Sequence, residues 1–403
     1  MIRGLLGIAC LALAGAAPVF AQVMGPTLGE LLAQSPAVVQ ADAERRAAES
    51  RARQLEIGQY ETQVETGLTR RDAGLDGDFA EWNLGVSRQV RWPEKRRLDE
   101  ALARNARHQA RTRFEQVWRN EVLDWARLWT EFTLAEARAR LASERIQGAQ
   151  ARLDAEQIRV QQGRGREIDR DRFRRDLALA EVAHGEAETV VRLARLALDM
   201  RFVGASGMEM PVEAILAACA APEASPGSPA VRLAQLEGER IDLERRRTQS
   251  DLLPDPQLGL NLFSERDGDE TGLGVTVSVP IAGGYRRARR DASDDLARAA
   301  AAARRAAEAE VERQRLEVEM RAVDGSRRRD QARAAEIAAR SVIDRLERGL
   351  SLQAVTMLDL LEARQALLTA QLASAEAQAA FDHARLQRAI LSGCPNPSAV
   401  LSD

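Results

Sequence analysis

Residues 257–280 read QLGLNLFSERDGDETGLGVTVSVP. Apolar side chains stand at every second position on both sides of a polar turn segment, and small or polar side chains alternate with them. This period of two predicts a β-hairpin with strands at about 257–264 and 272–280, one apolar face and one polar face. A noisier copy of the pattern predicts a second hairpin with strands at about 60–70 and 81–92.

The two hairpins have two interpretations. They are either small soluble hairpins packed on helices, or membrane strands with the apolar face toward lipid and the polar face toward a lumen. Aromatic residues at both ends of the strands favour the second, because such residues form girdles at the two membrane interfaces. The expected girdle is Tyr60, Trp92 and Tyr285 at one level and Phe79, Trp82 and Phe263 at the other.

Four strands cannot close a barrel, and an open sheet edge cannot lie in lipid because its backbone groups would have no partners. No segment after residue 21 approaches 18 consecutive apolar residues, so a membrane-spanning part would have to consist of strands. Three chains with four strands each would give about 12 strands, which is wide enough for a lumen. The sequence therefore predicts a barrel shared between chains.

The chain after the first 21 residues reads as two copies of one pattern, which span residues 22–200 and 229–393 and contain one hairpin each. Ser35-Pro36-Ala37-Val38 recurs as Ser228-Pro229-Ala230-Val231, and each copy begins a helix with Ser at the N-cap and Pro at the first helical position. Each hairpin is followed by a very long helical tract, at about 94–161 and 286–348. Returning helices follow at about 168–200 and 356–391, so each copy ends in a helical hairpin.

Apolar seams with heptad spacing support the long helices. In the first copy the seam is Trp118, Val122, Trp125, Trp129 and Phe132. In the second it is Ala332, Ala335, Ala339, Val342 and Leu346. Glycines interrupt both tracts where the chain turns back, and the expected tips contain Gly163, Gly165, Gly349, Leu350 and Ser351.

The remaining segments predict an exported chain with simple connections. Residues 1–21 have the charged start, apolar run and small-residue end of a secretory signal peptide. Residues 201–228 form a connector rich in Pro, Gly, Ala and Ser, and residues 394–403 form a tail. Cys219 and Cys394 would remain after cleavage, and the sequence leaves open whether they form a disulfide or stay unpaired.

Composition and motifs exclude several functional classes. The formal net charge is −3, and the acidic residues balance the arginines along the helices, so no basic face for nucleic acid is expected. Lys95 is the single lysine, and no phosphate-binding loop contains it. The three histidines are far apart in helical tracts. We therefore expect no catalytic site, no metal site and no cofactor.

The duplicated order of elements in this chain resembles the TolC-like outer membrane efflux family. The features that carry the resemblance are the Ser-Pro helix start, the hairpin, the helix entries Arg96-Arg97 and Arg286-Arg287, and the final helix that begins near Leu358-Asp359-Leu360-Leu361-Glu362. Arg91-Trp92-Pro93-Glu94-Lys95-Arg96-Arg97 is similar to the heavy-metal branch related to the exporter of cobalt, zinc and cadmium. The resemblance covers nearly the whole mature chain.

This resemblance implies a homotrimer with a 12-stranded β-barrel in the outer membrane and a 12-helix α-barrel in the periplasm. It implies that the helical tips dock on a periplasmic adaptor protein, which links them to an inner-membrane pump, of the RND type. Family tips are closed by carboxylate rings, and Asp359 and Glu362 match those positions. Both residues are equally consistent with a solvated helix start.

The sequence thus predicts a mainly α chain with a membrane β-barrel, and the resemblance implies that it acts as a passive exit duct of a tripartite efflux system. The expected cargo is heavy-metal cations or small toxic compounds. The alternative from another class is a soluble periplasmic coiled-coil adaptor protein, although adaptors have one helical hairpin set between β-rich domains.

Overall fold

The computed structural model describes residues 28–393 except 73, 75–76, 209–211, 219–227, 282 and 353. The predicted signal peptide, both Cys219 and Cys394, and the tail from residue 394 lie outside the described residues. The alternative between a disulfide and two unpaired thiols therefore stays as the sequence leaves it.

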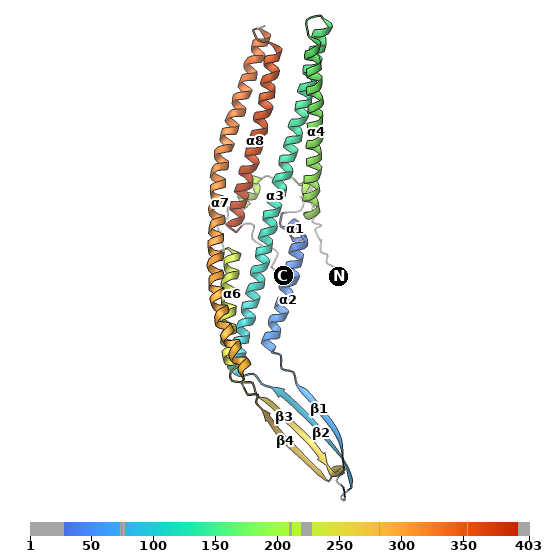
Figure 1. Cartoon of the computed structure of the whole chain (residues 1–403), viewed down its shortest axis with the longest axis vertical. Coiled ribbons are helices and arrows are strands. Elements are labelled where there is room, and N and C mark those ends of the chain that lie inside the picture. The colour runs from blue at the N-terminus through green and yellow to red at the C-terminus, as the bar shows by residue number, and fades with distance from the viewer. Residues whose placement is uncertain are drawn as a thin grey trace, which may run out of the picture.

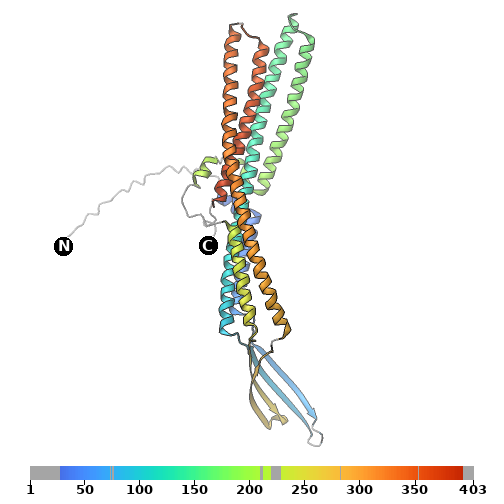
Figure 2. The same cartoon turned by 60° about the vertical axis from the view of Figure 1, so that its left-hand side comes forward.

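The molecule is elongated, with a β-sheet at one end and two helical hairpin tips at the other (Figures 1 and 2). The elements of the described residues are α1 Leu28–Ala33, α2 Pro36–Ile57, β1 Gln63–Asp72, β2 Asp78–Gln89, α3 Pro93–Gln161, α4 Glu167–Arg201, η2 Ala205–Gly207, α5 Val212–Ala218, α6 Pro229–Ser250, β3 Gln257–Glu265, η3 Arg266–Gly268, β4 Glu270–Ser278, α7 Gly284–Ser351 and α8 Met357–Leu391. The 69 residues of α3 span about 100 Å at 1.5 Å per residue. Within the described part of the chain, no helix is long and apolar enough to cross a membrane.

The two predicted hairpins join in one antiparallel sheet of order β1-β2-β3-β4. Strand β2 of the first hairpin pairs with β3 of the second, with Val86 opposite Leu260. The strands begin and end at other residues than expected: Tyr60 precedes β1, and Trp92 is the N-cap residue of α3. Neither of these two residues therefore lies in a strand.

The helices lie in a curved row in which α3 contacts α2, α4, α6 and α8, while α7 contacts α6 and α8. Helices α2 and α4 succeed one another along the long axis, and so do α6 and α8 (Figure 1). One chain therefore forms four neighbouring helical columns over most of its length.

The main core lies at mid-height around α3. The predicted aromatic seam of this helix is buried, with Trp125 fully enclosed and Trp118 and Phe132 each 2% exposed. Side chains from α1, α2, the end of α4 and the end of α8 complete this cluster. The seam thus joins both helical hairpins, since α3 is the helix that contacts elements of both copies.

The seam expected on α7 is partly wrong. Ala332, Ala339 and Leu346 are partly buried, but Ala335 and Val342 are exposed. The observed buried stripe also has heptad spacing, but it contains Glu336 in place of Ala335 and Ile343 in place of Val342. Because alanine provides little apolar contrast, the sequence pattern of this helix fits two neighbouring stripes equally well.

Candidate functional site

One face of the sheet is apolar and exposed. A row across all four strands shows the register: Val64 pairs with Val86, Val86 with Leu260, and Leu260 with Val275. The large apolar side chains of this face are between 41% and 88% exposed. They are Val64, Leu68, Trp82, Leu84, Val86, Leu258, Leu260, Leu262, Leu273, Val275 and Val277. A contiguous exposed apolar surface of this kind marks a place where lipid or another protein is bound.

The opposite face carries small and polar side chains. The row beside the one above contains Glu65, Gly85, Asn261 and Gly274. A Cβ atom at Gly85 would lie 2.6 Å from Oδ1 of Asn261, so glycine leaves the space that the asparagine side chain occupies. Asn261 also donates to the hydroxyl of Thr276 at 3.2 Å. The polar face therefore has little side-chain bulk at this row, and a hydrogen bond joins its side chains across β3 and β4.

The register corrects part of the expected aromatic girdle. Trp82 lies on the apolar face at the turn end of the sheet, opposite Leu68. Phe79 and Phe263 pair with Arg71 and Gly272, which places both phenylalanines on the polar face. The Phe263 ring covers Gly272, where a Cβ atom would lie 2.3 Å from the ring. These two residues are wrong as members of a girdle on the apolar face, because neighbouring residues in a strand point to opposite sides.

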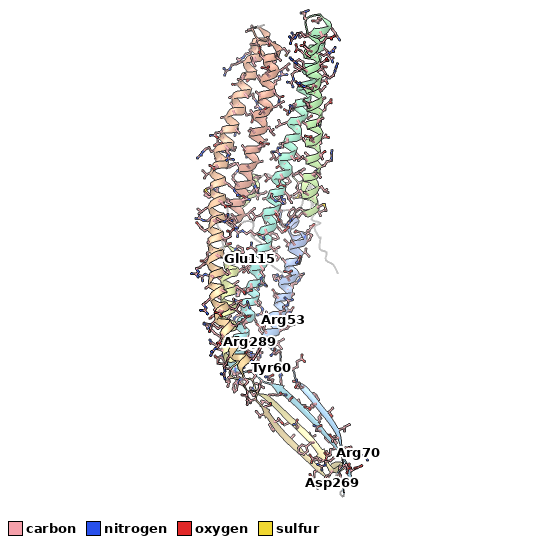
Figure 3. All side chains as sticks on the ribbon, in the orientation of Figure 1. Arg53, Tyr60, Arg70, Glu115, Asp269 and Arg289 are labelled. Carbon is pink, nitrogen blue, oxygen red and sulfur yellow. The ribbon has the colours of Figure 1, made fainter. Side chains whose placement is uncertain are left out.

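At the other end of the sheet, Tyr60, Trp92 and Tyr285 lie near the junction with the helices. Figure 3 labels Tyr60 there, together with Arg289 of α7. Trp92 is 40% exposed and donates through Nε1 to the carbonyl of Pro254 at 2.9 Å, while Tyr285 is 79% exposed. Tyr60 instead points into a polar network, which the sequence did not predict.

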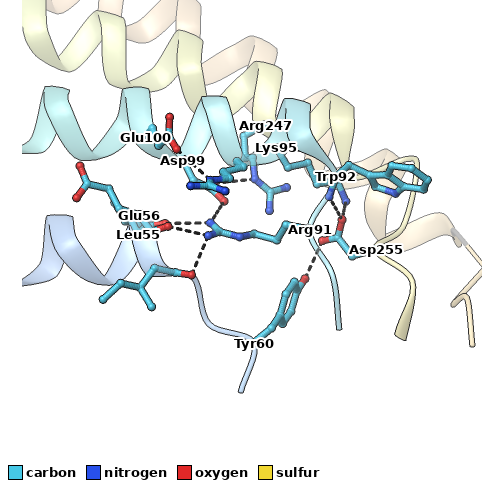
Figure 4. A network of polar contacts seen from close by, with 12 residues as sticks. Leu55, Glu56, Tyr60, Arg91, Trp92, Lys95, Asp99, Glu100, Arg247 and Asp255 are labelled. Atoms are coloured by element: carbon cyan, nitrogen blue, oxygen red, sulfur yellow. Dashed lines mark hydrogen bonds and ion pairs between the residues drawn. The ribbon is translucent and has the colours of Figure 1, made fainter. Parts of the chain in front are cut away.

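The centre of this network is Lys95, which is only 2% exposed (Figure 4). Its Nζ lies 3.0 Å from Oδ1 of Asp255 and 3.2 Å from Oδ1 of Asp251. Asp255 also accepts hydrogen bonds from the Tyr60 hydroxyl at 2.8 Å and from the Trp92 backbone N–H at 3.3 Å. Burial raises the pKa of Asp255, but the hydrogen bonds from Lys95, Tyr60 and Trp92 outweigh it and lower the pKa below its usual value.

Arg91 extends the network to the end of α2. Its guanidinium donates to the carbonyls of Leu55, Glu56 and Ile57 at 2.8–3.0 Å and to the Asp99 carboxylate at 2.7 Å. These carbonyls have no partner within the helix, so a cation at this position satisfies them and opposes the negative end of the helix dipole. Asp99 also accepts from Arg247 of α6 at 2.8 Å. The junction thus ties α2, α3, α6 and both hairpins together.

The tip between α3 and α4 is a tight turn. Gly163 has φ +69°, and the backbone N–H groups of Arg164 and Gly165 both donate to the carbonyl of Arg159. A Cβ atom at Gly165 would lie 2.7 Å from the backbone nitrogen of Val160, so only glycine fits there. Both glycines predicted at this tip therefore have a structural role.

The tip between α7 and α8 differs from the expected break at Gly349. Helix α7 continues through Gly349 and Leu350 to Ser351. The chain turns after it, where the backbone N–H of Ala354 donates to the carbonyl of Gly349 at 2.8 Å. Gly349 faces Val355, whose side chain would lie 3.1 Å from an added Cβ atom.

Asp359 has a defined local role at the start of α8. The Thr356 hydroxyl accepts from the Asp359 backbone N–H at 3.3 Å, and Oδ2 of Asp359 accepts from the Thr356 backbone N–H at 2.8 Å. This reciprocal pair is a capping box. Hydrogen bonds from Thr356 lower the pKa of Asp359. Glu362 is exposed one turn later and forms no hydrogen bond or ion pair with the described residues.

The capping box yields a first prediction. Thr356→Ala removes the side-chain acceptor for an otherwise unpaired N–H and is expected to destabilise the first turn of α8 by about 1 kcal/mol. Hydrogen exchange of the amides at 357–361 should accelerate about fivefold. Thr369→Ala on the same helix is the control, because the Thr369 hydroxyl only bonds back to the Gln365 carbonyl. Equal protection in the two variants would contradict the role assigned to Thr356.

Among the described residues, no group of three or more His, Cys, Asp or Glu side chains is placed to hold a metal ion. The sequence did not single out Asp255, Asp99 or Asn261. Lys95 was the one available signal, since a single lysine among so many arginines is unusual.

Solved structures share this fold. The outer membrane protein VceC of Vibrio cholerae superimposes with a TM-score of 0.72 at 16% identity, over 90% of this chain and 95% of VceC. The Campylobacter jejuni outer membrane channel CmeC gives 0.72 at 13% identity, over 92% and 86%. The outer-membrane channel OprN gives 0.73 at 15% identity, over 91% and 89%.

No protein-family model and no curated protein sequence matches the chain. The likeness to the solved structures, at such low identity, confirms the TolC-like resemblance at the level of the fold.

Proposed function

We propose that three copies of this chain form an outer membrane exit duct, in which a shared 12-stranded β-barrel continues into a 12-helix tube in the periplasm. The observation that carries the proposal is the sheet, which presents an exposed, mainly apolar face and an opposite polar face. The arginines of the apolar face, Arg70 and Arg88, lie near the two ends of the strands. A lipid-facing surface outside and a polar lumen inside require this arrangement. The molecule is long enough for a large periplasmic portion beyond the membrane.

The sheet edges support assembly from several copies. Within the described chain, β1 and β4 each have a neighbouring strand on one side only. If β4 of one copy pairs with β1 of the next, all edges disappear, which a sheet in lipid requires. Four strands and four helical columns per chain give twelve of each in a trimer.

The outer columns of the helical row have exposed apolar side chains that suit contacts between copies. Helix α4 exposes Leu179, Val182, Leu193, Leu196 and Met200, each by more than half. Helix α7 exposes Leu316, Met320 and Val323 at the opposite end of the row. At about 1.5 Å per residue from the tips, Leu193, Leu196 and Met200 lie at the level of the α7 residues, so packing α4 of one copy on α7 of the next would bury these side chains and close the tube.

We propose the partners that the resemblance to the TolC-like family implies. The two helical tips, including Gly163, Gly165, Gly349, Leu350 and Ser351, would dock on a periplasmic adaptor protein that links the duct to an inner-membrane pump of the RND type. The duct itself would be passive and carry out no chemical step. We infer heavy-metal cations or small toxic compounds as cargo.

Three of the six residues expected in the aromatic girdle keep this proposed role. Trp82 would lie at the outer interface, and Trp92 and Tyr285 at the periplasmic interface. Tyr60 is tied to Asp255, and Phe79 and Phe263 would face the lumen.

The alternative, a soluble periplasmic adaptor, explains the structure less well. In a soluble protein the apolar sheet face would need a cover, and no described helix packs on it. The two copies also contribute equally to one sheet.

Density-gradient fractionation of expressing cells, followed by native mass measurement of the detergent-extracted protein, tests this proposal. We expect the protein in the outer membrane fraction with a mass of three chains. A soluble periplasmic monomer or dimer would overturn the duct and favour the adaptor.

We further propose that Asp359 and Glu362, at the start of α8, form a gate at the tip of the tube. A threefold ring of carboxylates would favour cations near the tip. Since one Asp359 oxygen serves the capping box, Glu362 should contribute more of this effect. Glu362→Gln is expected to lower the cation preference of single channels in planar bilayers more than Asp359→Asn does. Unchanged selectivity in the double variant would remove the gate.

A further inference from the structure

A pocket of about 370 Å³ lies at mid-height in the second copy, where α6 begins and α8 ends. Arg119 of α3, Ser228 at the start of α6 and Leu391 at the end of α8 line one side. Val311, Gln314 and Val318 of α7 line the other. The pocket therefore combines an apolar wall with a guanidinium group.

The corresponding place in the first copy is full and balanced in charge. There the Ser35 hydroxyl donates to Glu121 at 2.6 Å instead of capping its own helix. Arg201, at the end of α4, pairs with the same carboxylate. Aromatic side chains of α3 fill the space around this cluster. The Glu121 carboxylate thus has both a hydrogen-bond donor, Ser35, and a cation, Arg201.

In the second copy the serine faces a cation and not an anion. Arg119 donates through Nη2 to the carbonyl of Leu391 and lies 3.5 Å from the Ser228 hydroxyl. Among the described residues, no carboxylate forms an ion pair with it, and its Nε is buried without a hydrogen-bond partner. The other arginines at the pocket, Arg315 and Arg388, pair with Glu312 and Glu319.

An unpaired, partly buried guanidinium is costly, and burial lowers the pKa of Arg119. The contact with Leu391 places a cation at the end of α8, which accounts for one edge of the guanidinium. The Nε atom still has no hydrogen-bond partner among the described residues. A carboxylate that enters the pocket would complete the arrangement.

The segment that follows the pocket has the matching chemistry. Residues 394–403 read CPNPSAVLSD, and their only charged side chain is Asp403. The segment begins two residues after Ser392, which itself lines the pocket. Five residues, 394–398, separate Gly393 from the apolar run Ala399-Val400-Leu401. They can span up to about 17 Å, enough to turn back to the pocket.

We propose that the pocket binds the chain's own segment 399–403, with Val400 and Leu401 against Val311 and Val318 and the Asp403 carboxylate against the guanidinium group of Arg119. The segment would then hold together the end of α8, the start of α6 and α3 at the level where the two helical hairpins meet. This role is independent of what passes through the molecule.

Disulfide trapping in the full chain tests the proposal. In a background with Cys219→Ser and Cys394→Ser, Leu401→Cys is combined with Gln314→Cys, which lines the pocket. The control combines it with Arg313→Cys, the adjacent exposed residue on the same helix. Under mild oxidation we expect the Gln314→Cys pair to cross-link within one chain at least about tenfold faster, as a preference of about 1.4 kcal/mol requires.

Two charge variants test the ion pair. Asp403→Asn is expected to reduce the rate for the Gln314→Cys pair to that of the control, and Arg119→Gln to do the same. Asp403→Asn changes no residue of the described helices and strands, so it remains informative if Arg119→Gln fails to fold.

Three outcomes would overturn the proposal. Equal rates at 314 and 313 would mean that the segment is not held in the pocket. Cross-links between two chains would assign the pocket to another copy. The connector 201–228 also contains a carboxylate, Glu223. A loss of the preference in Glu223→Gln but not in Asp403→Asn would assign Arg119 to the connector.

Discussion

Val275→Arg is expected to abolish assembly in the outer membrane, whereas Thr276→Arg next to it should assemble. Val275 is 76% exposed on the apolar face of β4, opposite Leu260. An arginine on the lipid face of a membrane barrel costs about 2–4 kcal/mol at mid-membrane depth. A trimer carries the substitution three times, so the penalty is about 6–12 kcal/mol for the assembled barrel.

Thr276→Arg is a matched control because it lies in the same strand, is also exposed and faces the other way. A polar lumen accepts a cation there, and the variant loses only the hydrogen bond with Asn261 at 3.2 Å. The amount of heat-resistant trimer extracted from outer membranes measures the effect. If both variants assemble alike, the apolar face is not in lipid and the proposed duct fails with it.

The sequence was sufficient to predict these two faces. The alternation from Leu258 to Val277 has a period of two, and the same periodicity places Phe263 on the polar side, since it follows Leu262 directly. The position of Phe79 and Phe263 along the strands fits a girdle, but the facing direction, which follows from the same periodicity, does not.

Other features differ in how far the sequence predicts them. The seam of α7 is ambiguous because alanines at neighbouring stripes differ little in hydrophobicity, and only packing against α8 distinguishes Ile343 from Val342. The capping box is local and could be predicted from Thr356 and Asp359, three residues apart. The junction network is non-local, since Tyr60, Lys95 and Asp255 come from segments far apart in the sequence.

Lys95→Met is the second substitution with a large expected effect. It preserves the length and apolar stem of the side chain but leaves Asp255, itself 3% exposed, without its cation. Removing one partner of a buried ion pair typically costs 3–5 kcal/mol. Arg96→Met is the control, because Arg96 is exposed and pairs only with Glu100 on the same helix. It should cost less than about 0.5 kcal/mol.

The sign of the pH dependence distinguishes this cause from lost packing. In the parent chain the pKa of Asp255 is lowered, so its contribution to stability is present above the pKa of the unfolded chain and is lost as the pH falls. Without Lys95, burial should raise that pKa, and the carboxyl group becomes neutral on mild acidification. The difference in thermal midpoint between Lys95→Met and the parent should therefore shrink from pH 8 to pH 4.

A double variant separates the effect of the uncompensated charge from that of lost packing. Asp255→Asn combined with Lys95→Met removes the uncompensated charge, so it should be more stable than Lys95→Met alone at pH 8. Asp251 does not prevent this recovery, because it keeps its ion pair with Arg247. If Lys95→Met is no less stable than Arg96→Met, or if the double variant is the weaker of the two, the buried pair does not hold the junction. The sheet would then be positioned by Arg91 and the end of α2, whose four hydrogen bonds do not involve Lys95.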